Sequence, residues 1–339
     1  MRALVTGGAG FIGSHLSDAL IGQGHRVICL DDLSTGSLRN IRRLEGEARF
    51  EFVQGSILDR ATVDRLVSDA DHVYHLGAAV GVKLIYGRPV DTIMTNVVGT
   101  EIVLSAAARH RRKIFVASTS EVYGKDTREG CGRFRETDDI TLGSSIRWCY
   151  ATAKALDEYL ARAYMIEQGL EVVIGRFFNT VGPRQSGAYG MVVPRFVQQV
   201  LVGGPITIYG DGRQIRTFTW VADTVHAVIG LMNHPGAIGE IFNIGSEEPV
   251  TINELAQLVQ HLAGRTVATQ YIPYELAYGP GFEDARYRVP DISKLRALLG
   301  YRPTRSLDDV LLEVIEYVKR SVERDGTLRA ETPGVLPKG

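Results

Sequence analysis

The sequence has no long apolar run, almost no net charge and few cysteines, and each shortage excludes a class of protein. No stretch approaches the ~20 apolar residues of a membrane-spanning helix, and no charged leader precedes an apolar segment at the amino end. The formal net charge of −1 gives no overall field that would draw the chain to nucleic acid or to an anionic membrane. We therefore expect neither a membrane nor a nucleic acid among its partners.

The three cysteines, Cys29, Cys131 and Cys149, are odd in number and lack the spacing of a metal site. This cysteine usage indicates a reducing cytoplasm and predicts no metal centre. With 45% hydrophobic and 23% charged residues, the composition is otherwise that of an ordinary globular protein. A chain of 339 residues can form one large domain or two moderate ones. We expect a soluble cytoplasmic protein.

From residue 2 to about residue 176, short apolar runs alternate with longer amphipathic segments. Strands separated by helices predict βαβ units, and hence an α/β fold whose parallel sheet is covered by helices on both faces. The carboxyl ends of the strands then lie along one edge, where ligands bind. The predicted strands cover residues 3–6, 26–30, 50–54, 72–76, 114–117 and 172–176, and the clearest helices cover residues 91–109 and 148–168.

The alternation ends after residue 176, where glycine, proline and arginine become frequent. We expect strands at 218–221 and 241–244 to rejoin the first sheet, and helices at 252–262 and 307–322 to belong to a smaller carboxy-terminal lobe. The predicted division is residues 1–176 with 219–248 for the larger domain, 177–218 and 249–324 for the lobe, and 325–339 for a mobile tail.

A glycine-rich segment, Thr6-Gly7-Gly8-Ala9-Gly10-Phe11-Ile12-Gly13, links the first predicted strand to a helix that begins near Phe11. Glycines allow a tight turn there, let backbone amides approach a pyrophosphate, and let the helix pack closely on the sheet. Asp31 ends the second predicted strand, where a carboxylate accepts hydrogen bonds from the adenosine ribose and repels a 2′-phosphate. The sequence thus predicts a Rossmann-type doubly wound sheet that binds NAD rather than NADP. The predicted cofactor-binding residues are Gly7, Gly10, Phe11, Ile12, Gly13, Asp31, Asp32, Ser34, Thr35, Gly36, Ser56, Ile57, Leu76, Ala78, Tyr150 and Lys154.

Three polar side chains suit a dehydrogenase. Thr119 follows the predicted strand at 114–117, and Tyr150 and Lys154 share one face of a predicted helix. A tyrosine titrates near 10 when unperturbed. We expect the ammonium group of Lys154 and the positive nicotinamide of NAD⁺ to lower the pKa of Tyr150. Tyr150 is then the predicted base that takes a proton from a substrate hydroxyl, and Thr119 is predicted to hydrogen-bond the same hydroxyl.

Ordered motifs extend from residue 2 to about residue 320, namely TGGAGFIGSHL, DDLSTG, STSEVYG, YATAK, RFFNTVGPRQ, IYGDGRQIRTFTWVAD and RVPD. By these motifs the chain resembles the extended short-chain dehydrogenase/reductase family, whose members are nucleotide-sugar epimerases, dehydratases and decarboxylases. The resemblance implies firmly bound NAD, a seven-stranded sheet, a small lobe for the sugar nucleotide, and a homodimer formed through the helices at 91–109 and 148–168. Two positions depart from the usual pattern, because Ser56 stands where many members have aspartate and Asp32 where asparagine is frequent.

Members of this family oxidise a sugar hydroxyl, usually at C4, and then decarboxylate, epimerise or dehydrate the ketone. Glu121, the Arg147-Trp148-Cys149-Tyr150 run, Arg216-x-Phe-Thr and the 278–284 run before Arg288 resemble UDP-glucuronate decarboxylases. This resemblance implies that Glu121 positions the sugar and that Arg216 acts near C5 and the carboxylate. The implied product is UDP-xylose or a UDP-4-ketopentose, since a ketone β to a carboxylate lets carbon dioxide leave.

A nucleotide-sugar 4-epimerase or a 4,6-dehydratase stays open as the alternative. Ser120 stands where dehydratases of the deoxythymidine-diphosphoglucose type carry an acid, which disfavours that subtype, whereas Glu121 could act as a C5 base in a dehydratase of the GDP-mannose type. Glu121 also argues mildly against a galactose-type 4-epimerase. A remote alternative is a non-catalytic NAD-sensing protein, but such proteins often lose the Tyr–Lys pair that this chain keeps.

A diphosphate carries about two negative charges and, in a nearly neutral protein, needs at least one arginine. Asn179, Arg213 and Arg288 are the predicted diphosphate contacts, and Pro194 with Arg195 is predicted to border the base of a UDP-sugar. The predicted substrate-binding residues are Ser120, Asn179, Pro194, Arg195, Arg213, Arg216 and Arg288, and the predicted catalytic residues are Thr119, Glu121, Tyr150, Lys154 and Arg216.

Overall fold

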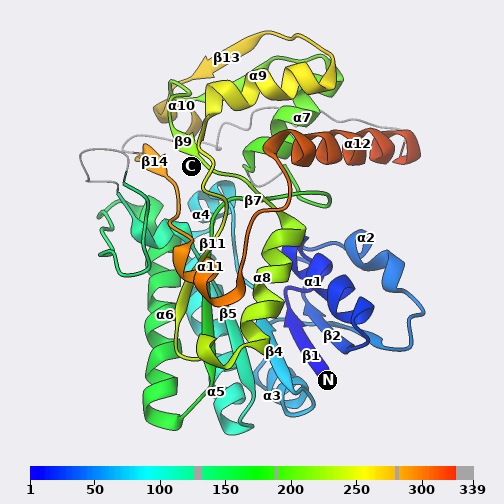
Figure 1. The fold of residues 1–339 in the computed structure, drawn as a ribbon, viewed down its shortest axis with the longest axis vertical. Helices are drawn as coiled ribbons and strands as arrows, with labels where there is room; N and C mark the ends of the chain where they lie inside the picture. The colour runs from blue at the N-terminus through cyan, green and yellow to red at the C-terminus, as the bar shows by residue number, and fades with distance from the viewer. Residues whose placement is uncertain (126–131, 188–189, 279–281, 326–339) are drawn as a thin grey trace.

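A computed structural model describes residues 1–125, 132–187, 190–278 and 282–325 of the chain. Cys131, two glycines of the 278–284 run (Gly279 and Gly281) and all but the first residue of the predicted tail at 325–339 lie outside these ranges. Within them, no helix combines the length and the apolar content that a membrane crossing requires. Figure 1 shows a central sheet between two layers of helices, with further helices and short strands above one edge of that sheet.

The central sheet has seven strands in the order β11-β6-β5-β4-β1-β2-β3, and every neighbouring pair is parallel. This arrangement confirms the predicted α/β class and brings all carboxyl ends of the strands to one edge. The strands are β1 (Arg2–Thr6), β2 (Arg26–Asp31), β3 (Phe50–Gln54), β4 (His72–His75), β5 (Lys113–Thr119), β6 (Val172–Phe177) and β11 (Ile241–Ile244).

Alternate side chains of the strands enter two separate apolar clusters, because successive residues of a strand point to opposite faces. Val5 of β1 joins the cluster beneath α1 (Phe11–Gly22), α8 (Val221–Asn233) and α11 (Ser293–Leu299). Its neighbour Leu4 joins the cluster beneath α3 (Arg60–Ser68), α5 (Pro89–Arg109) and α6 (Cys149–Gln168). The sheet is therefore covered on both faces, and its open edge is the one where the strands end (Figure 1).

The carboxy-terminal part forms a third apolar cluster from α7 (Val192–Val202), α9 (Ile252–Ala263) and α12 (Leu307–Asp325). A capping box of Thr251 and Glu254 begins α9, which satisfies orphan amides at that helix end. The helices predicted at 252–262 and 307–322 are confirmed. Short strands complete this part: β8 (Ile206–Tyr209) pairs with β13 (Thr269–Ile272), and β9 (Ile215–Arg216) pairs with both β12 (Val250–Thr251) and β14 (Tyr287–Arg288). The helix α10 (Tyr274–Tyr278) follows β13.

One strand prediction is wrong. The segment at 218–221 does not rejoin the central sheet, because its strand β10 (Thr219–Trp220) pairs with β7 (Thr180–Val181) in a separate two-stranded sheet. The reason is local, since α8 begins at Val221 with Trp220 as its N-cap and leaves no length for a four-residue strand. The strand predicted at 241–244 does join the central sheet as β11. The boundaries of the predicted domains stay a prediction.

Candidate active site

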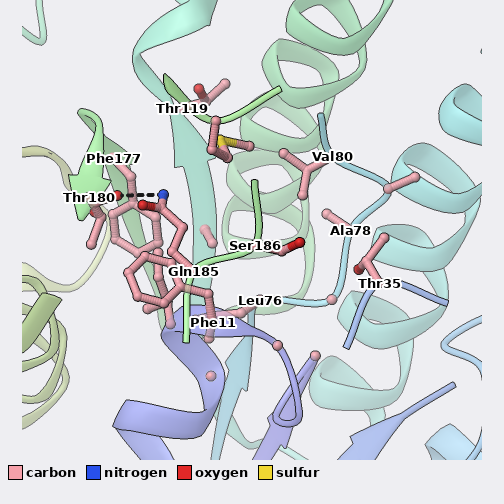
Figure 2. A pocket seen from close by; sticks show the side chains of 18 of the residues that line it. Phe11, Thr35, Leu76, Ala78, Val80, Thr119, Phe177, Thr180, Gln185 and Ser186 are labelled. Carbon is pink, nitrogen blue, oxygen red and sulfur yellow. Dashed lines mark hydrogen bonds between the residues drawn. The ribbon is translucent and has the colours of Figure 1, made fainter. Parts of the chain in front are cut away.

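A cavity of about 960 Å³ opens at the carboxyl edge of the sheet. Figure 2 shows Ala78 and Val80 along one side of it, and Phe11, Phe177 and Gln185 along the other. Most of the residues predicted from the sequence meet in its lining, namely Gly7, Gly10, Phe11, Ile12, Gly13, Asp31, Asp32, Ser34, Thr35, Ile57, Leu76, Ala78, Thr119, Ser120, Glu121, Tyr150, Lys154, Asn179 and Arg288. The lining does not include Gly36, Ser56, Pro194, Arg195, Arg213 or Arg216.

The glycine loop at the base of the cavity depends on its missing side chains. Gly7 has φ 67° and a Cβ there would lie 2.8 Å from the amide nitrogen of Gly77, while a Cβ on Gly13 would lie 2.2 Å from the carbonyl oxygen of Gly7. The helix α1 that follows has neither a side-chain cap nor an acidic residue in its first turn. Its free amides and positive dipole end suit an anionic group. The loop therefore fits the pyrophosphate of a dinucleotide.

Asp31, at the end of β2, has a second task that sequence reasoning missed. Its carboxylate accepts hydrogen bonds from the amide of Ala9 at 2.9 Å and from the amide of Leu33 at 2.8 Å, so it holds the glycine loop against the next turn. Burial raises the pKa of Asp31. A carboxylate has about four acceptor positions, so acceptor capacity is left for ribose hydroxyls. A Cβ on Gly36 would come within 2.6 Å of this carboxylate, so Gly36 serves by leaving it room.

Two neighbouring polar residues shape turns. Asp32 accepts a hydrogen bond from the amide of Ser34 at 2.9 Å, and both residues line the cavity. Ser56 accepts one from the amide of Leu58 at 3.2 Å and is not brought to the cavity, whereas the adjacent Ile57 is. The position where many family members carry an aspartate thus makes a local turn in this chain.

Thr119, Tyr150 and Lys154 lie together on the lining, from the end of β5 and the first turns of α6. The Thr119 and Tyr150 side chains are hydrogen-bonded. Burial raises the pKa of Tyr150, the Glu121 and Asp157 carboxylates raise it further, and the Thr119 hydrogen bond lowers it. This net direction is opposite to the expected effect of Lys154. The main reason is burial of the phenol, followed by the Glu121 and Asp157 carboxylates. In addition, the Lys154 ammonium group is paired with the Oδ2 atom of Asp157 at 2.8 Å.

Glu121 lies among three arginines in a buried cluster beyond Thr119. Its Oε2 atom is 2.7 Å from Nη1 of Arg147, and its Oε1 atom is 3.6 Å from Nη1 of Arg288. Burial alone would raise the pKa of Glu121, but the guanidinium groups of Arg147, Arg288 and Arg216 lower it to about 2. Glu121 is therefore ionised over the working pH range and is a poor proton acceptor.

Arg288 is the residue of this cluster that still has a hydrogen-bond donor without a partner. Burial lowers the pKa of Arg288 to about 10, and the Glu121 carboxylate works against that effect. Its Nη2 atom is buried without a hydrogen-bond partner, and its side chain lines the cavity. Leaving a buried donor unpaired costs about 1–3 kcal/mol, so the cavity suits an anion that would accept from this nitrogen.

Four residues predicted for the substrate lie elsewhere. Arg216 is outside the lining, and its Nη2 atom is 2.8 Å from Oδ2 of Asp284. Arg213 is exposed. Pro194 and Arg195 are in α7, where the Arg195 guanidinium lies 4.2 Å from the ring centroid of Tyr209. The first turn of α7 does reach the cavity, through Met191, Val192 and Val193.

Other residues line or support the site without having been assigned a role from the sequence, although Arg184 was a rival candidate for the diphosphate. Arg147 immediately precedes the tyrosine helix, and its position in the Arg147–Tyr150 run was the available signal. Segment 183–187 also borders the cavity, through Arg184, Gln185 and Ser186. The segment is tied to α1, because the His15 ring nitrogen Nε2 lies 3.0 Å from the Pro183 carbonyl oxygen and Arg184 Nη1 lies 2.7 Å from Asp18 Oδ2.

A Rossmann sheet whose glycine loop and Thr–Tyr–Lys group meet in one cavity defines a dinucleotide-dependent enzyme of the extended short-chain dehydrogenase/reductase class. The model of the GDP-mannose 4,6 dehydratase family matches residues 4–314. The chain belongs to this family.

Two relatives and one solved structure are similar to this chain over nearly its whole length. The chain is 41% identical, over 96% of its own length and 99% of the relative's, to a UDP-N-acetyl-alpha-D-glucosaminuronate decarboxylase from Bacillus cytotoxicus. It is 36% identical to UDP-glucuronic acid decarboxylase 1 of Danio rerio, over 95% of this chain and 73% of the relative. A UDP-glucuronic acid 4-epimerase from Bacillus cereus, solved with UDP-glucuronic acid and NAD, superposes with a TM-score of 0.85 at 32% identity, covering 95% of this chain and all of the epimerase.

Proposed function

We propose that this enzyme uses NAD to decarboxylate a UDP-hexuronate, either UDP-glucuronate or its 2-acetamido counterpart. The observation that carries the proposal is Arg288, which lines the cavity beside Glu121 and whose buried Nη2 atom has no hydrogen-bond partner. The names of the relatives in Bacillus cytotoxicus and Danio rerio support the same reaction class.

The cofactor end of the cavity supports NAD. The amides at the start of α1 and the glycine loop would hold the pyrophosphate, and the remaining acceptor positions of Asp31 would take the ribose hydroxyls. When bound, NAD would supply a hydride acceptor and, in its oxidised form, a positive charge. That charge favours the phenolate and opposes the effect of Glu121 and Asp157 on the pKa of Tyr150.

Oxidation at C4 needs a base and an orienting group, which we assign to Tyr150 and Thr119. Tyr150 takes the proton of the C4 hydroxyl as the C4 hydrogen leaves as hydride, and Thr119 hydrogen-bonds the same oxygen. Lys154, paired with Asp157, keeps a cation on the same helix face. The C4 alcohol thereby becomes a ketone that lies β to the C6 carboxylate.

Arg288 would receive that carboxylate. Three guanidinium groups, of Arg147, Arg216 and Arg288, face two carboxylates, of Glu121 and Asp284, in the cluster. One positive charge is thus uncompensated, which suits an anionic sugar. The C5–C6 bond then breaks, carbon dioxide leaves, the electron pair forms an enolate with the C4 ketone, and C5 takes up a proton. If the hydride were returned to C4 the product would be the UDP-pentose, and release before that return would give the 4-ketopentose.

The low pKa of Glu121 favours decarboxylation over 4,6-dehydration. Dehydration requires a base that removes the C5 proton, and a carboxylate with a pKa of about 2 is too weak a base for that task. Decarboxylation requires no C5 base, because the electrons come from the breaking C5–C6 bond. A hexuronate 4-epimerase remains the second candidate, favoured by the likeness to the Bacillus cereus enzyme.

The test is incubation of the purified enzyme with UDP-glucuronate and with UDP-N-acetylglucosaminuronate, and with UDP-glucose as a control. We expect carbon dioxide and a product lighter by that amount from at least one hexuronate. Conversion without a change of mass would replace the proposal by epimerisation, and loss of water would replace it by dehydration. Equal behaviour of the wild type and Tyr150→Phe would favour an NAD-sensing protein.

A homodimer through α5 and α6 is part of this proposal. The two helices pack side by side (Figure 1), and both carry exposed apolar side chains, including Val90 (70% exposed), Tyr159 (62%) and Ile166 (77%). Exposed apolar side chains gathered on one helix pair suit a protein interface. Sedimentation of the purified chain tests this point, and a monomer at micromolar concentration would contradict it. The cytoplasmic location stays a prediction.

A further inference from the structure

Glu121 and Arg288 lie next to each other on the cavity lining although they come from distant parts of the chain. Glu121 belongs to the single turn Ser120–Tyr123 after β5, and Arg288 ends β14 in the carboxy-terminal part. Their closest atoms are 3.6 Å apart, farther than the 2.7 Å between Glu121 and Arg147. Because this direct contact is loose, other contacts must set the separation of the two groups.

The side chain of Asn243, on β11, touches both of these segments and is fully buried. Its Oδ1 atom accepts a hydrogen bond from the Tyr123 hydroxyl at 2.6 Å. Its Nδ2 atom donates to the carbonyl oxygens of Phe134 at 2.8 Å and of Asp291 at 3.2 Å. Tyr123 ends the turn that carries Glu121, and Asp291 follows closely after Arg288. Both donor hydrogens and the acceptor of one short amide are therefore used to join the two segments.

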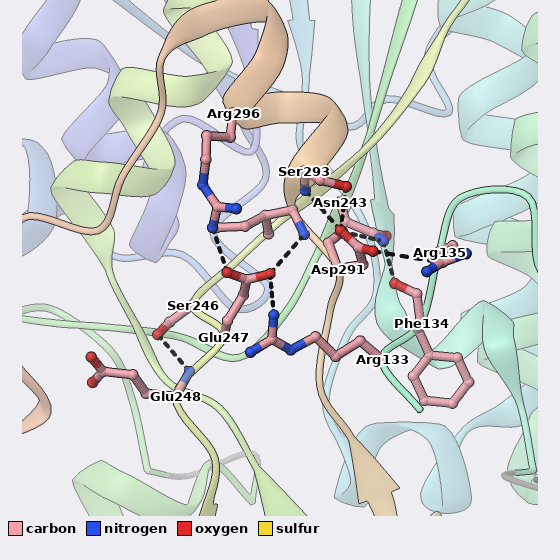
Figure 3. A network of polar contacts seen from close by, with 11 residues as sticks. Arg133, Phe134, Arg135, Asn243, Ser246, Glu247, Glu248, Asp291, Ser293 and Arg296 are labelled. Atoms are coloured by element: carbon pink, nitrogen blue, oxygen red, sulfur yellow. Dashed lines mark hydrogen bonds and ion pairs between the residues drawn. The ribbon is translucent and has the colours of Figure 1, made fainter. Parts of the chain in front are cut away.

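Phe134 makes further contacts that join the Glu121 turn to the segment after Arg288. Its amide donates to the carbonyl oxygen of Val289 and its carbonyl accepts from the amide of Asp291, each at 2.8 Å, so the chain after Arg288 is paired to it on both sides. The ring of Phe134 stacks on the ring of Tyr123 with centroids 4.6 Å apart. Figure 3 shows the Phe134 carbonyl, Asn243 and Asp291 converging at this point.

An outer layer of charges surrounds these contacts, and its three arginines are 39–68% exposed while its carboxylates, Glu247 and Asp291, are 16% and 19% exposed. Glu247 pairs with Arg133 at 2.8 Å and with Arg296, and Asp291 pairs with Arg135 (Figure 3). Exposed ion pairs contribute little, typically about 0–1 kcal/mol each. The buried amide, whose donors cannot be replaced by water, carries most of the positional constraint.

We propose that Asn243 is a positioning residue that fixes the distance between Glu121 and Arg288, although it does not line the cavity. The inference rests on the proposed function only for its effect on rate. Asn243 acts through the Tyr123 hydroxyl on the Glu121 turn and through the Phe134 and Asp291 carbonyls on the Arg288 strand.

The test compares Asn243→Asp with Glu247→Gln as the matched control, and uses Tyr123→Phe as a second variant that leaves the amide in place. A carboxylate at position 243 would face two carbonyl oxygens. We expect kcat for the hexuronate to fall about 10- to 100-fold, because displacement of reacting groups by about 1 Å can cost that much, while the NAD content is unchanged. Lower pH should restore part of the rate in Asn243→Asp, because a protonated carboxyl can donate to one carbonyl again. Tyr123→Phe should lower kcat in the same way, and Glu247→Gln should not.

Hydrogen exchange measured on the same proteins separates this inference from the proposed function. Peptides covering residues 120–124 and 287–291 should both exchange faster in Asn243→Asp than in Glu247→Gln, whatever substrate the enzyme uses. Lower thermal stability with unchanged exchange at both peptides and unchanged kcat per folded enzyme would overturn the positioning role. Failure of the wild type to decarboxylate any hexuronate would remove the proposed function, and the exchange result would still decide the role of Asn243.

Discussion

The ammonium group of Lys154 lies 2.8 Å from the Oδ2 atom of Asp157, one turn further along α6, and the two side chains are 3% and 0% exposed. The pairing offsets much of the positive charge beside Tyr150, whose pKa is raised by burial and by the carboxylates of Glu121 and Asp157. The readiness of Tyr150 to accept a proton therefore depends on Asp157 as well as on Lys154.

Replacing Asp157 by asparagine should move the pH profile. The change removes a negative charge that raises the pKa of Tyr150, so the phenol loses its proton at lower pH. The rate rises with pH as the phenolate forms, and we expect this rising limb of the kcat/KM profile to shift to lower pH in Asp157→Asn. A limb that stays in place, with NAD content equal to the wild type, would contradict the coupling.

Removing the phenol should abolish most of the reaction. In Tyr150→Phe we expect kcat to fall by about 10²- to 10⁴-fold, the usual contribution of a positioned base, with the melting temperature and NAD content close to wild type. Single-turnover formation of NADH after mixing with the hexuronate measures the oxidation step by itself. Oxidation at the wild-type rate in this variant would show that another group takes the proton.

Arg288 can be assigned to the sugar carboxylate or to the diphosphate by comparing two ligands. In Arg288→Gln we expect affinity for UDP-glucuronate to fall about 10- to 100-fold, as for loss of a charge-assisted hydrogen bond, while affinity for UDP changes much less. Titration calorimetry with both ligands measures the difference. An equal loss for UDP and UDP-glucuronate would return Arg288 to the diphosphate, as the sequence predicted.

His75 should make the fold sensitive to mild acid. Its ring nitrogens lie 2.8 Å from the Thr6 hydroxyl and 3.0 Å from the Thr100 hydroxyl, and burial lowers its pKa from 6.5 to about 3. Between these values the unfolded chain binds a proton that the folded chain does not, so stability is lost as pH falls through 6.5. We expect about 2 kcal/mol of unfolding free energy to be lost between pH 7 and pH 5 from this residue. Urea denaturation at both pH values checks this, and His75→Asn should show a loss smaller by that amount.

The sheet, the glycine loop and the Tyr–Lys pair could be predicted because their signals are local. Strand periodicity, the spacing of Gly7, Gly10 and Gly13, and the helix face shared by Tyr150 and Lys154 are all visible within a few residues. The strand at 241–244 was also predicted from the sequence, because its apolar run is short and clearly bounded. The wrong strand at 218–221 has an apolar run of the same kind, and only the start of α8 at Val221 ends it.

The roles of the residues around the sugar site could not be predicted from local patterns, because these roles depend on pairing between residues that are distant in the sequence. The sequence assigned Arg216 to the sugar carboxylate and Arg288 to the diphosphate. In the structure Arg216 is paired with Asp284, whereas Nη2 of Arg288 has no hydrogen-bond partner. Lys154 was expected to lower the pKa of Tyr150, but it is paired with Asp157, and burial together with the Glu121 and Asp157 carboxylates raises that pKa. Asn243 gave no signal, since its side chain joins residues that lie 48 to 120 positions away.

The ties of segment 183–187 to α1, through His15 with Pro183 and through Arg184 with Asp18, bear on how the coenzyme is supplied. Because the segment borders the cavity and is held to α1 at two points, it would slow the exchange of a coenzyme bound there. A retained coenzyme would be able to return each hydride to the product of the same sugar, which is the route to the UDP-pentose. The flux through such an enzyme would follow the supply of substrate and would be insulated from the balance of oxidised and reduced coenzyme in the surrounding cell.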